Sequence, residues 1–414
     1  MNSLEIYVDE TDHPTHAGTL YVHRRGRAQS ASFSYNSSYI ATPDAWAIDP
    51  ALTLQTGAFQ TPNSRALFGA LTDCAPDRWG RTLVERREKR LAASQGRTAR
   101  TLSELDFLIG VRDDLRQGAL RFAALNTDAP FLAEDSDGVP ALTDLPALLD
   151  LAAKAENDTA DLSDLQRLVH VGSSLGGARP KAHVRSPDGA LAIAKFPSAN
   201  HDTWNVMAWE KVALHLAARC GIRVPNSSLL NLAGRSVLVI ERFDRLRHRR
   251  VGYMSAMSML EAADGDHRSY LEIAEILEQR SDRTTQELHE LWIRAAFSML
   301  ISNTDDHLRN HGFLHSRADI WTLSPAFDLN PSPEPGPPLL STSIDGTDEP
   351  ATPAMLLAVA PLFRLEDAHA RQELRRIAAV TAQWQQSAAQ HGLNARELNE
   401  MSPAFDMIAA ATAV

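Results

Sequence analysis

Residues 168–197 read LVHVGSSLGGARPKAHVRSPDGALAIAKFP, and this stretch decides how the rest of the chain is interpreted. Short apolar runs alternate here with a glycine-rich segment and with the sequence SPDG at residues 186–189. In SPDG, Pro187 fixes its own φ and Gly189 tolerates a positive φ, which is typical of a tight turn. The pattern therefore predicts a strand, a glycine-rich turn, a second strand, a tight turn and a third strand.

Downstream of this stretch the pattern changes from mixed to mainly helical. We expect an amphipathic helix over residues 204–218 and then two strands, SSLLNL at 227–232 and SVLVIERFD at 236–244. From residue 270 onward the spacing is helical, with two short strands, HGFLHS and IWTLS, as interruptions. The helical runs are YLEIAEILEQ, TTQELHELWIRAAFSMLISN and ARQELRRIAAVTAQWQQSAAQ. This is the order of elements in an α+β, two-lobed protein-kinase-like fold, with a β-rich N-lobe and a mainly helical C-lobe. Order alone identifies no function.

Upstream of the same stretch, residues 3–42 contain the alternating runs LEIYVDE, GTLYVHRR and ASFSYN, which predict a small antiparallel sheet. Between residues 64 and 111 apolar residues recur three and four positions apart, which predicts helices that cover this sheet. Residues 126–164 are acidic and include one helical run near 142–154. We therefore expect four segments: a small β-rich N-terminal subdomain at 1–125, an acidic connection at 126–164, the N-lobe at 165–245 and the helical C-lobe at 246–414.

The composition of the 414-residue chain excludes several classes of protein. The 41 Lys and Arg against 52 Asp and Glu give a formal net charge of −11, so non-specific binding to nucleic acid is not expected. Only Cys74 and Cys220 are available, which argues against a disulfide framework and an all-cysteine metal site. The first residues do not resemble a signal peptide, and no apolar stretch approaches the roughly 20 residues that span a bilayer. We expect a cytoplasmic protein without membrane contact.

The glycine-rich segment and the strand after it carry the first candidate site residues. Glycines at 172–177 allow backbone N–H groups to approach phosphate oxygens, and Lys181 adds positive charge. A hairpin turn that needs a positive φ is the competing interpretation. Lys195 ends the strand ALAIAK, where a kinase-type site holds a lysine against the α- and β-phosphates, and Glu210 on the next helix is the candidate to position it. Taken alone, a lysine at a strand end is more often a solvated residue, and a single glutamate on a helix is equally unremarkable.

The segment NTDDHLRN at residues 303–310 is the most specific feature of the sequence. Asp305 and Asn310 match the D-x-x-x-x-N spacing of a kinase catalytic loop, in which the aspartate takes the proton of the attacking hydroxyl and the asparagine holds a metal. Asp328, preceded by Phe327, lies eighteen residues after Asn310, where a second metal-binding carboxylate is expected.

Two other interpretations of Asp305, Asp306 and His307 stay open when the segment is taken alone. One is a helix C-terminal turn with Asx-type hydrogen bonds, and the other is a zinc site. An amide partner favours Mg²⁺, which takes oxygen ligands together with substrate phosphates. Because all the weak signals occur in the order that a kinase requires, their combination predicts ATP-dependent phosphoryl transfer.

On these residues the sequence resembles the HipA family, serine/threonine kinases of bacterial type II toxin–antitoxin systems, over nearly the whole chain. SSLGGARPK resembles the family's glycine-rich phosphate loop, IAKFP its nucleotide-lysine strand and VIERFDR its hinge. NTDDHLRN resembles its catalytic loop and PAFDLNPS its metal-aspartate motif. The N-terminal sheet with APDRWGR at residues 75–81 is similar to the small domain that precedes the kinase core. The resemblance implies the HipA-like form of the kinase fold.

Carried over position by position, the resemblance implies a site for ATP and Mg²⁺. Asp305 would be the catalytic base, Asn310 and Asp328 would hold Mg²⁺, and the backbone of Glu241 and Phe243 would bond adenine. The other nucleotide-site residues that it implies are Gly176, Gly177, Ala178, Arg179, Pro180, Lys181, Lys195, Arg242, His307, Leu308, Arg309 and Phe327.

Ser174 matches the position that family members autophosphorylate as an off-switch, and Ser173 beside it is an alternative. The charge of a phosphate beside the nucleotide's own phosphates gives such a switch a physical basis. Arg179-Pro180 replaces the Gln-Glu of the best-known branch, and Leu329 replaces the glycine of a DFG motif, so the hinge motion of ordinary protein kinases is not carried over.

The resemblance also implies partners. Protein substrates are expected, with aminoacyl-tRNA synthetases among them, and growth arrest is the expected result. A small DNA-binding helix-turn-helix antitoxin, HipB-like, is expected to bind the chain, so contact with DNA would be indirect. The alternative function is that of a weakly active or inactive kinase-fold protein that works mainly as co-repressor of that antitoxin. The acidic net charge suits a basic partner.

Overall fold

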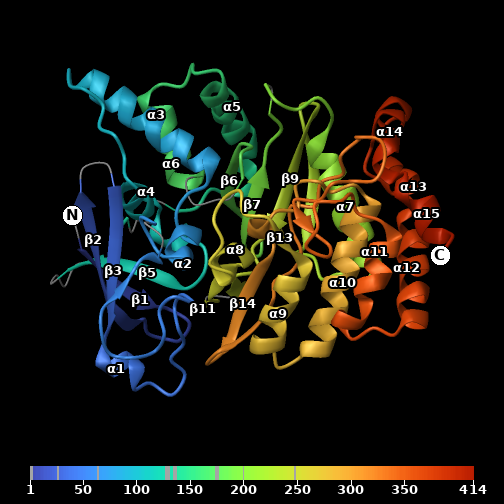
Figure 1. Cartoon of the computed structure of the whole chain (residues 1–414). Helices are drawn as coiled ribbons and strands as arrows, with labels where there is room; N and C mark the ends of the chain where they lie inside the picture. The colour runs from blue at the N-terminus through green and yellow to red at the C-terminus, as the bar shows by residue number, and fades with distance from the viewer. Residues whose placement is uncertain are drawn as a thin grey trace. The chain divides into compact units, whose positions relative to one another are not determined.

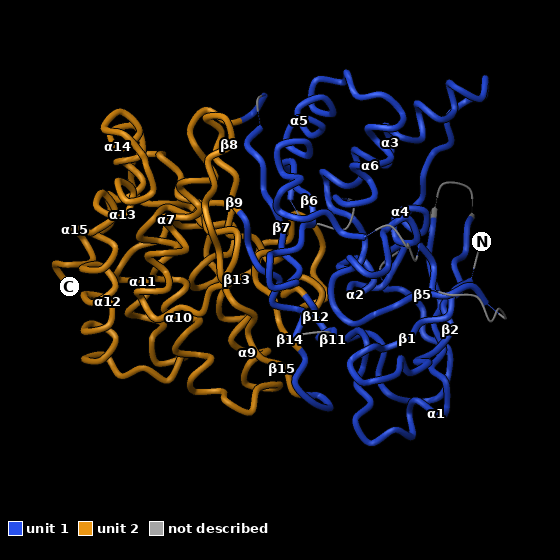
Figure 2. Tube along the Cα trace, turned by 180° about the vertical axis from the view of Figure 1, so that it is seen from behind, with its two compact units in different colours: residues 1–201, 239–254, 315–319 blue, residues 202–238, 255–314, 320–414 orange. Residues whose placement is uncertain are grey.

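The computed structural model describes residues 3–25, 28–62, 65–125, 131–133, 138–172, 177–198, 200–246 and 249–414. These residues form an α+β structure, whose elements are labelled in Figure 1. The chain divides into two compact units, which Figure 2 shows in different colours. Unit 1 consists of Met1–His201, Val239–Met254 and His315–Asp319, and unit 2 of Asp202–Leu238, Ser255–Leu314 and Ile320–Val414.

The elements of unit 1 are β1 (Ser3–Val8), β2 (Thr15–Arg25), β3 (Ala28–Tyr35), α1 (Ser37–Ile40), β4 (Phe59–Gln60), α2 (Gly69–Asp73), α3 (Arg78–Ser94), α4 (Glu104–Gly110), β5 (Leu120–Ala124), α5 (Leu145–Glu156), α6 (Leu162–Gly172), β6 (Lys181–Arg185), β7 (Leu191–Lys195), β10 (Arg245–Leu246) and β11 (Arg249–Arg250). Three strands have residues in both units: β9 (Arg235–Glu241), β12 (Tyr253–Ser255) and β14 (Gly312–Arg317).

The elements of unit 2 are α7 (Val206–Arg219), β8 (Ser227–Leu232), α8 (Ala256–Met259), β13 (Arg268–Ser269), α9 (Tyr270–Arg280), α10 (Thr284–Leu300), β15 (Ile320–Leu323), β16 (Thr342–Ser343), α11 (Pro353–Val359), α12 (Asp367–Thr381), α13 (Trp384–Gln390), α14 (Ala395–Met401) and α15 (Met407–Thr412). Short 3₁₀ helices occur at Asp113–Leu115, Leu142–Asp144, Leu308–Asn310, Ala360–Phe363 and Ser402–Phe405. None of the helices in the described part of the chain is both long enough and apolar enough to cross a bilayer.

The N-terminal sheet of unit 1 confirms the antiparallel sheet predicted for residues 3–42. Its strand order is β4-β3-β2-β1-β5, and β1 alternates half-buried with buried residues along its length. The side chains of Leu4, Ile6 and Phe33 are completely buried. β5 was not predicted. It pairs antiparallel with β1, so that Phe122 lies opposite Ile6 and adds a further buried ring to the sheet.

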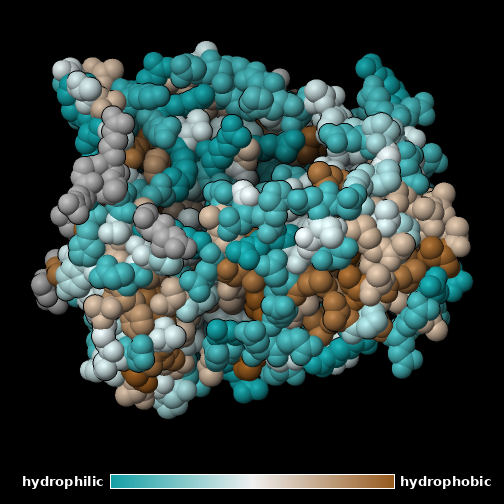
Figure 3. All heavy atoms as spheres, viewed as in Figure 1, coloured by the Kyte–Doolittle hydropathy of each residue, from teal (hydrophilic) through white to brown (hydrophobic). Residues whose placement is uncertain are grey.

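Helices α2, α3 and α4 form where the helical spacing predicted helices. α3 buries Trp79, Leu83 and Val84 on one side. α4 begins with a capping box in which Ser103 and Asp106 exchange hydrogen bonds. Figure 3 shows mainly hydrophilic side chains over α3, where Arg78, Lys89 and Arg90 are exposed.

The prediction of a strand at residues 168–171 is wrong. These residues form the last turns of α6, whose buried side chains include Leu165, Leu168 and Val169. Their spacing is helical, but the four-residue run LVHV cannot be told from a strand by its composition. The glycine-rich segment therefore joins a helix to β6, and not one strand to another.

The two strands predicted after the glycine-rich segment are confirmed as β6 and β7. They pair antiparallel, with Lys181 opposite Lys195, and the turn between them has Gly189 at a φ of +86°. The end of β9 continues this sheet in unit 1, where the Arg242 N–H donates to the Leu191 carbonyl oxygen at 2.9 Å. In unit 2, β8 and the start of β9 form the predicted pair of strands.

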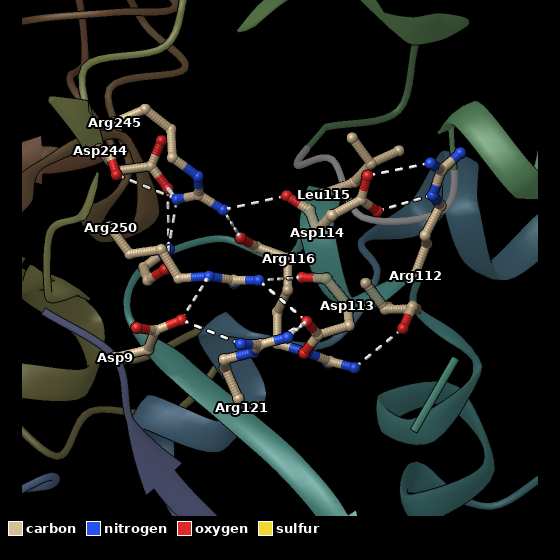
Figure 4. Close-up of polar contacts among 12 residues, drawn as sticks. Asp9, Arg112, Asp113, Asp114, Leu115, Arg116, Arg121, Asp244, Arg245 and Arg250 are labelled. Carbon is tan, nitrogen blue, oxygen red and sulfur yellow. Dashed lines mark hydrogen bonds and ion pairs between the residues drawn. The ribbon is translucent and has the colours of Figure 1, made fainter. Parts of the chain in front are cut away.

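A buried network of charged side chains lies in unit 1, and Figure 4 shows its members pointing toward one another. Asp244 is 3% exposed and accepts hydrogen bonds from Arg242 Nε, Arg245 Nη1 and the Gly118 N–H, each at 2.8 Å. Burial raises the pKa of Asp244, but the two arginines outweigh this effect and leave the pKa well below its usual range. The carboxylate is therefore ionised in the interior.

The Arg242 guanidinium extends this network to two other segments. It donates to the Leu115 carbonyl oxygen at 2.6 Å and to His183 Nε2 at 2.8 Å. His183 Nδ1 lies 3.1 Å from the Val171 carbonyl oxygen, which makes Nδ1 the protonated nitrogen of a neutral ring. Burial and the charge of Arg242 hold the pKa of His183 well below its usual value. The hinge segment, the chain before β5 and strand β6 are thus joined through one side chain.

A second buried carboxylate, Asp113, lies between two further arginines. Its Oδ2 is 2.6 Å from Arg121 Nη2 and 3.0 Å from Arg250 Nη2. Asp9, at the end of β1, contacts the same two arginines at 3.1 and 3.5 Å. Because an unpaired charge in the interior costs several kcal/mol, this network constrains where each of these segments can lie.

The core of unit 2 is built on α10. Trp292 and Phe297 are completely buried, and the buried carboxylates of Glu287 and Glu290 on the same helix hold Arg223 at 3.0 and 2.6 Å. Arg294, one turn after Glu290, also pairs with it. Arg223 lies in the loop between α7 and β8. This loop is therefore fixed to α10 by ion pairs as well as by apolar packing.

The helix predicted over residues 370–390 is two helices, α12 and α13, with a break at 382–383. The buried Thr381 hydroxyl donates to the Ile377 carbonyl oxygen at 2.8 Å, a bond that bends helices. Beyond the break, the Trp384 ring stacks on Phe405, with ring centroids 4.4 Å apart. Tertiary packing of Trp384 explains why the continuous helical pattern is interrupted.

The substitution Asp244→Asn tests the buried network. It leaves two buried arginines without their anion, so we expect the free energy of unfolding to fall by about 3–5 kcal/mol at pH 7 in urea titrations. Because the folded-state pKa of Asp244 is lower than the unfolded value of about 3.9, its stabilisation is complete at neutral pH and is lost in acid. The difference between wild type and variant should therefore shrink as the pH falls below about 4.

Asp12→Asn is the matched control. Asp12 pairs with Arg249 at 2.7 Å, but both side chains are largely exposed, so the loss should be under about 1 kcal/mol. Equal effects of the two substitutions would contradict the assignment of Asp244 as a buried structural charge.

Candidate active site

Gly177 is the first described residue after the start of the glycine-rich segment. Ser173, Ser174 and Gly176 of the predicted site lie outside the described residues. Gly177 has a φ of +89°, which side chains other than glycine rarely adopt. A Cβ at this position would lie 2.6 Å from Lys181 Nζ, so the absence of a side chain lets the ammonium group lie against the backbone.

Gly177 is held by the start of α3. Its N–H donates to the Asp77 carboxylate, and its carbonyl oxygen accepts the Trp79 N–H at 3.2 Å. The Trp79 indole Nε1–H donates to the Lys181 carbonyl oxygen at 3.3 Å. The APDRWGR sequence therefore fixes the backbone on both sides of the segment 178–180.

Lys181 and Lys195 lie directly opposite each other in β6 and β7, so their side chains share one face. Lys181 is buried, and Lys195 is half-buried. Between Gly177 and Lys181 the chain exposes Ala178, and the Pro180 carbonyl oxygen accepts the Phe196 N–H at 2.9 Å. The structure therefore places both predicted phosphate-site lysines on the same face of the β6–β7 hairpin.

The predicted hinge residues alternate in direction. The side chains of Arg242 and Asp244 are buried in the charge network, whereas those of Glu241 and Phe243 are half-buried. The Arg242 N–H is bonded to the carbonyl of Leu191 in β7, so the backbone groups of its two neighbours face the side away from β7. The Arg242 guanidinium is engaged in the network, so its side chain is fixed in the interior of unit 1.

The catalytic-loop segment gives its two adjacent aspartates opposite surroundings. The Asp305 side chain is 79% exposed, whereas Asp306 is 3% exposed. Asn310 Nδ2 donates to the Asp305 main-chain carbonyl oxygen at 2.9 Å, and the Asn310 N–H donates to the His307 carbonyl oxygen at 2.8 Å. These two bonds close the loop and fix Asn310 beside Asp305.

The residues between Asp305 and Asn310 have separate surroundings. His307 Nε2 is 4.0 Å from Asp305 Oδ1, and Leu308 is buried. Arg309 forms a bidentate pair with the carboxylate of Asp264. The side chain of His307 therefore lies beside that of Asp305, and the side chains of Leu308 and Arg309 have other surroundings.

The segment with Asp328 is held against the start of the catalytic loop. Asn330 Nδ2 donates to Asp328 Oδ1 at 3.2 Å, and the Asn330 N–H donates to Asn303 Oδ1 at 3.2 Å. Asp328 itself has a φ of +58°. The structure thus brings together the two segments that were predicted to hold a metal.

A small cavity lies between these same segments, with room for about one water molecule. Both segments contribute to its lining, which includes Asp306, Asn310, His311, Phe327 and Leu329.

Asn310 and Asp328 carry the kinds of group that Mg²⁺ prefers. Asn310 and Asp328 offer amide and carboxylate oxygens, and Mg²⁺ is commonly held by one or two such groups together with phosphates. Within the described ranges no group of three or more His, Cys, Asp or Glu side chains is placed to hold a metal ion. The zinc interpretation of the Asp305–His307 sequence therefore has no cluster to support it.

Sequence reasoning missed the partners of Asp306. The Tyr270 O–H donates to Asp306 Oδ2, and His311 Nε2 lies 2.9 Å from Asp306 Oδ1. Tyr270 is 36 residues away in the chain, so no local pattern links it to the loop. The one sequence signal is the pair of adjacent aspartates in NTDDHLRN, which indicates that the two carboxylates have different roles.

The predicted site residues are divided between the two units. Unit 1 contains Gly177, Ala178, Arg179, Pro180, Lys181, Lys195, Glu241, Arg242 and Phe243. Unit 2 contains Glu210, Asp305, His307, Leu308, Arg309, Asn310, Phe327 and Asp328. Glu210 is buried in α7.

Comparison of the sequence with known proteins identifies its family. Residues 173–385 match the family described as "HipA-like C-terminal domain". A protein of Haemophilus influenzae described as "Putative kinase" is 27% identical over 143 residues, which is 30% of this chain and 42% of that protein. The chain therefore spans less than half of the length of this curated relative.

Solved structures show the fold. The HipA chain of the Shewanella oneidensis MR-1 toxin–antitoxin complex of HipA, HipB and operator DNA superposes with a TM-score of 0.68 at 17% identity, over 99% of this chain and 96% of that chain. The Helicobacter pylori proinflammatory kinase CtkA matches with a TM-score of 0.43 at 16% identity, over 56% of this chain and 93% of that chain. The chain therefore has the predicted α+β, kinase-like fold and belongs to the HipA-like C-terminal domain family.

Proposed function

We propose that the chain is an ATP-dependent serine/threonine protein kinase, the toxin of a toxin–antitoxin pair. One observation carries the proposal: the exposed Asp305 carboxylate stands beside Asn310, whose side chain is bonded to the Asp305 carbonyl oxygen at 2.9 Å. This is the pair that a kinase loop uses to accept the proton of a hydroxyl and to hold a metal. The membership in the HipA-like family supports the same function.

In the proposed reaction Asp305 accepts the proton of a substrate Ser or Thr hydroxyl. The hydroxyl oxygen forms a bond to the γ-phosphorus of ATP, the bond from that phosphorus to the β–γ bridging oxygen breaks, and ADP leaves with that oxygen. The side chain of Asp305 is exposed enough to meet a protein substrate, whereas Asp306 is not.

Lys181 and Lys195 would bind the phosphates, because they place two positive charges on one face of the β6–β7 hairpin. Gly177 would contribute space and not a donor, since its N–H is bonded to Asp77. The backbone of Glu241 and Phe243 would bond the adenine edge. Asn310 and Asp328 would hold Mg²⁺, which, when bound, neutralises charge on the β- and γ-phosphates.

We further propose an aminoacyl-tRNA synthetase as substrate class and autophosphorylation of Ser174 or Ser173 as an off-switch. Both rest on the family resemblance of the motifs SSLGGARPK and NTDDHLRN. A phosphate at either serine would add about −1.5 to −2 charges to the glycine-rich segment and compete with the nucleotide's phosphates.

The second candidate function is that of a co-repressor. The similar Shewanella protein was solved with HipB and operator DNA. The net charge of −11 would attract a basic DNA-binding protein and would repel DNA itself. Both functions can reside in one chain.

The substitution Asp305→Asn tests the proposed base. It keeps the shape of the side chain and removes its capacity to take a proton, so phosphate transfer from radiolabelled ATP to a protein substrate or to the chain itself should fall by about 10²- to 10⁴-fold. Glu275→Gln, which neutralises an exposed carboxylate on α9, is the control and should transfer phosphate at the wild-type rate. Unchanged transfer in Asp305→Asn would refute the assignment.

A pair of glycine substitutions tests the phosphate site. Gly177→Ala and Gly189→Ala impose the same positive φ on an alanine, but only at Gly177 would the new Cβ meet Lys181 Nζ. We expect the Kd of Mg-ATP, measured by calorimetry, to rise about tenfold in Gly177→Ala, because the lysine is displaced from the phosphates. In Gly189→Ala it should stay within about twofold, since the new Cβ would lie in open space. Equal effects would place the nucleotide elsewhere.

Co-expression tests the partner. A small helix-turn-helix protein encoded next to this chain should co-elute with it in gel filtration at low salt. The complex should weaken as the ionic strength rises, because the attraction is between opposite charges. Separate elution at low salt, together with unaltered operator binding by that protein, would rule out the co-repressor function.

A further inference from the structure

Three buried side chains meet directly behind the proposed catalytic base: Tyr270, Asp306 and His311, here called the Asp306 bridge. Their exposures are 0%, 3% and 3%. The Tyr270 O–H donates to one carboxylate oxygen of Asp306, and His311 Nε2 lies 2.9 Å from the other. The ring of His311 packs edge-on against Tyr270, with centroids 5.2 Å apart. All three side chains belong to unit 2.

The Asp306 bridge closes the catalytic loop a second time. Asp305 and Asn310 are joined at the surface by the bond from Asn310 Nδ2, and Asp306 and His311, each one residue later, are joined in the interior. The two closures run side by side, one exposed and one buried. Two contacts therefore hold the two ends of the loop together: the exposed one between Asn310 and Asp305, and the buried one between His311 and Asp306.

The bridge also attaches the loop to structure outside it. Tyr270 is the first residue of α9, where Ser269 and Glu272 form a capping box that fixes the helix start. The His311 carbonyl oxygen accepts the Ala256 N–H, at the start of α8, at 2.7 Å. The position of Asp306 is thus set by two helices.

The charge state of the bridge agrees with its geometry. Burial raises the pKa of Asp306, but the nearby His311 and the hydrogen bond from Tyr270 outweigh it, so that the pKa lies below its usual value. Burial and the Asp306 charge raise the pKa of Tyr270 well above its usual value, which keeps its hydroxyl protonated as a donor. Both oxygens of the buried carboxylate therefore have a partner, as a buried charge requires.

We propose that Asp306 is a positioning residue for phosphate transfer: anchored by Tyr270 and His311, it turns the adjacent Asp305 outward and holds Asn310 beside it. The Asp305 side chain is 79% exposed and Asp306 is 3% exposed, so the two neighbours face opposite ways, and fixing Asp306 inward keeps Asp305 outward. The inference rests on the proposed kinase function and adds the device that orders its loop.

Two variants remove parts of the bridge. Tyr270→Phe deletes one hydroxyl and keeps the ring, and Asp306→Asn keeps the shape and removes the charge. With casein as probe substrate and radiolabelled ATP, we expect kcat to fall about tenfold in Tyr270→Phe, as the loss of one charge-assisted hydrogen bond implies, and further in Asp306→Asn. The KM for ATP should stay within about twofold, because Lys181 and Lys195 are untouched.

Hydrogen exchange supplies a readout that does not depend on activity. Amides of residues 303–311 should exchange faster in both variants than in the wild type, whereas Asp305→Asn should lose phosphate transfer without faster exchange in this segment. If the wild type transfers no phosphate, the proposed function fails, and the exchange of residues 303–311 still decides whether the bridge orders the loop.

Tyr39→Phe is the matched control. The Tyr39 hydroxyl is also buried and donates to the Trp46 carbonyl oxygen at 2.9 Å, but it lies in unit 1. This variant loses a comparable bond and should leave kcat and the exchange of residues 303–311 at wild-type values.

Two results would overturn the inference. Wild-type kcat and wild-type exchange in Tyr270→Phe and Asp306→Asn would mean that the bridge positions nothing. Complete loss of transfer in Asp306→Asn with wild-type exchange would mean that Asp306 acts in the chemistry itself.

Discussion

The ionised carboxylate of Asp244 is the constraint from which much of unit 1 follows. A charge in the interior needs cations, and Arg242 and Arg245 supply them. Their remaining N–H groups need acceptors in turn, and the carbonyl oxygens of Leu115 and Arg116 meet that need. The chain just before β5 is thereby fixed, and β5 completes the N-terminal sheet. The last free donor of Arg242 meets His183 in β6, whose ring stays neutral so that it can accept.

Unit 2 solves a similar problem with different partners. The buried Asp306 carboxylate is satisfied by a phenol and an imidazole, and not by guanidinium groups. Arginine keeps its charge at every ordinary pH, and its planar fork fixes several acceptors at once, which suits a junction of three chain segments. Asp306 fixes only one loop, and for this a single hydroxyl and a ring nitrogen are sufficient partners. In both units the carboxylate organises backbone that apolar packing alone would leave undefined.

The sequence predicted those parts of the fold and the site that depend on local spacing. The strands of the N-terminal sheet, the β6–β7 hairpin with Gly189 in its turn, and helices α7, α9 and α10 follow from periodicity and turn residues. The pairing of Asp305 with Asn310 follows from their spacing. Local spacing does not tell a short apolar helix end from a strand, so the run at 168–171 was misassigned.

Local spacing also does not reveal contacts between distant residues. The hydrogen bond from Gly177 to Asp77 spans 100 positions, and that from Tyr270 to Asp306 spans 36, so neither has a signature that a single sequence displays.

The opposed lysines of the β6–β7 hairpin link ligand binding to the stability of the fold. Like charges directly across a pair of strands repel each other, and an anion that bound beside both lysines would offset that repulsion. An anion that binds the folded chain and not the unfolded one adds RT ln(1 + [L]/Kd) to the free energy of unfolding. If ATP is that anion, its concentration in the cell sets how much folded protein persists as well as how fast it works. Nucleotide depletion would then shorten the lifetime of the chain and lower its activity together.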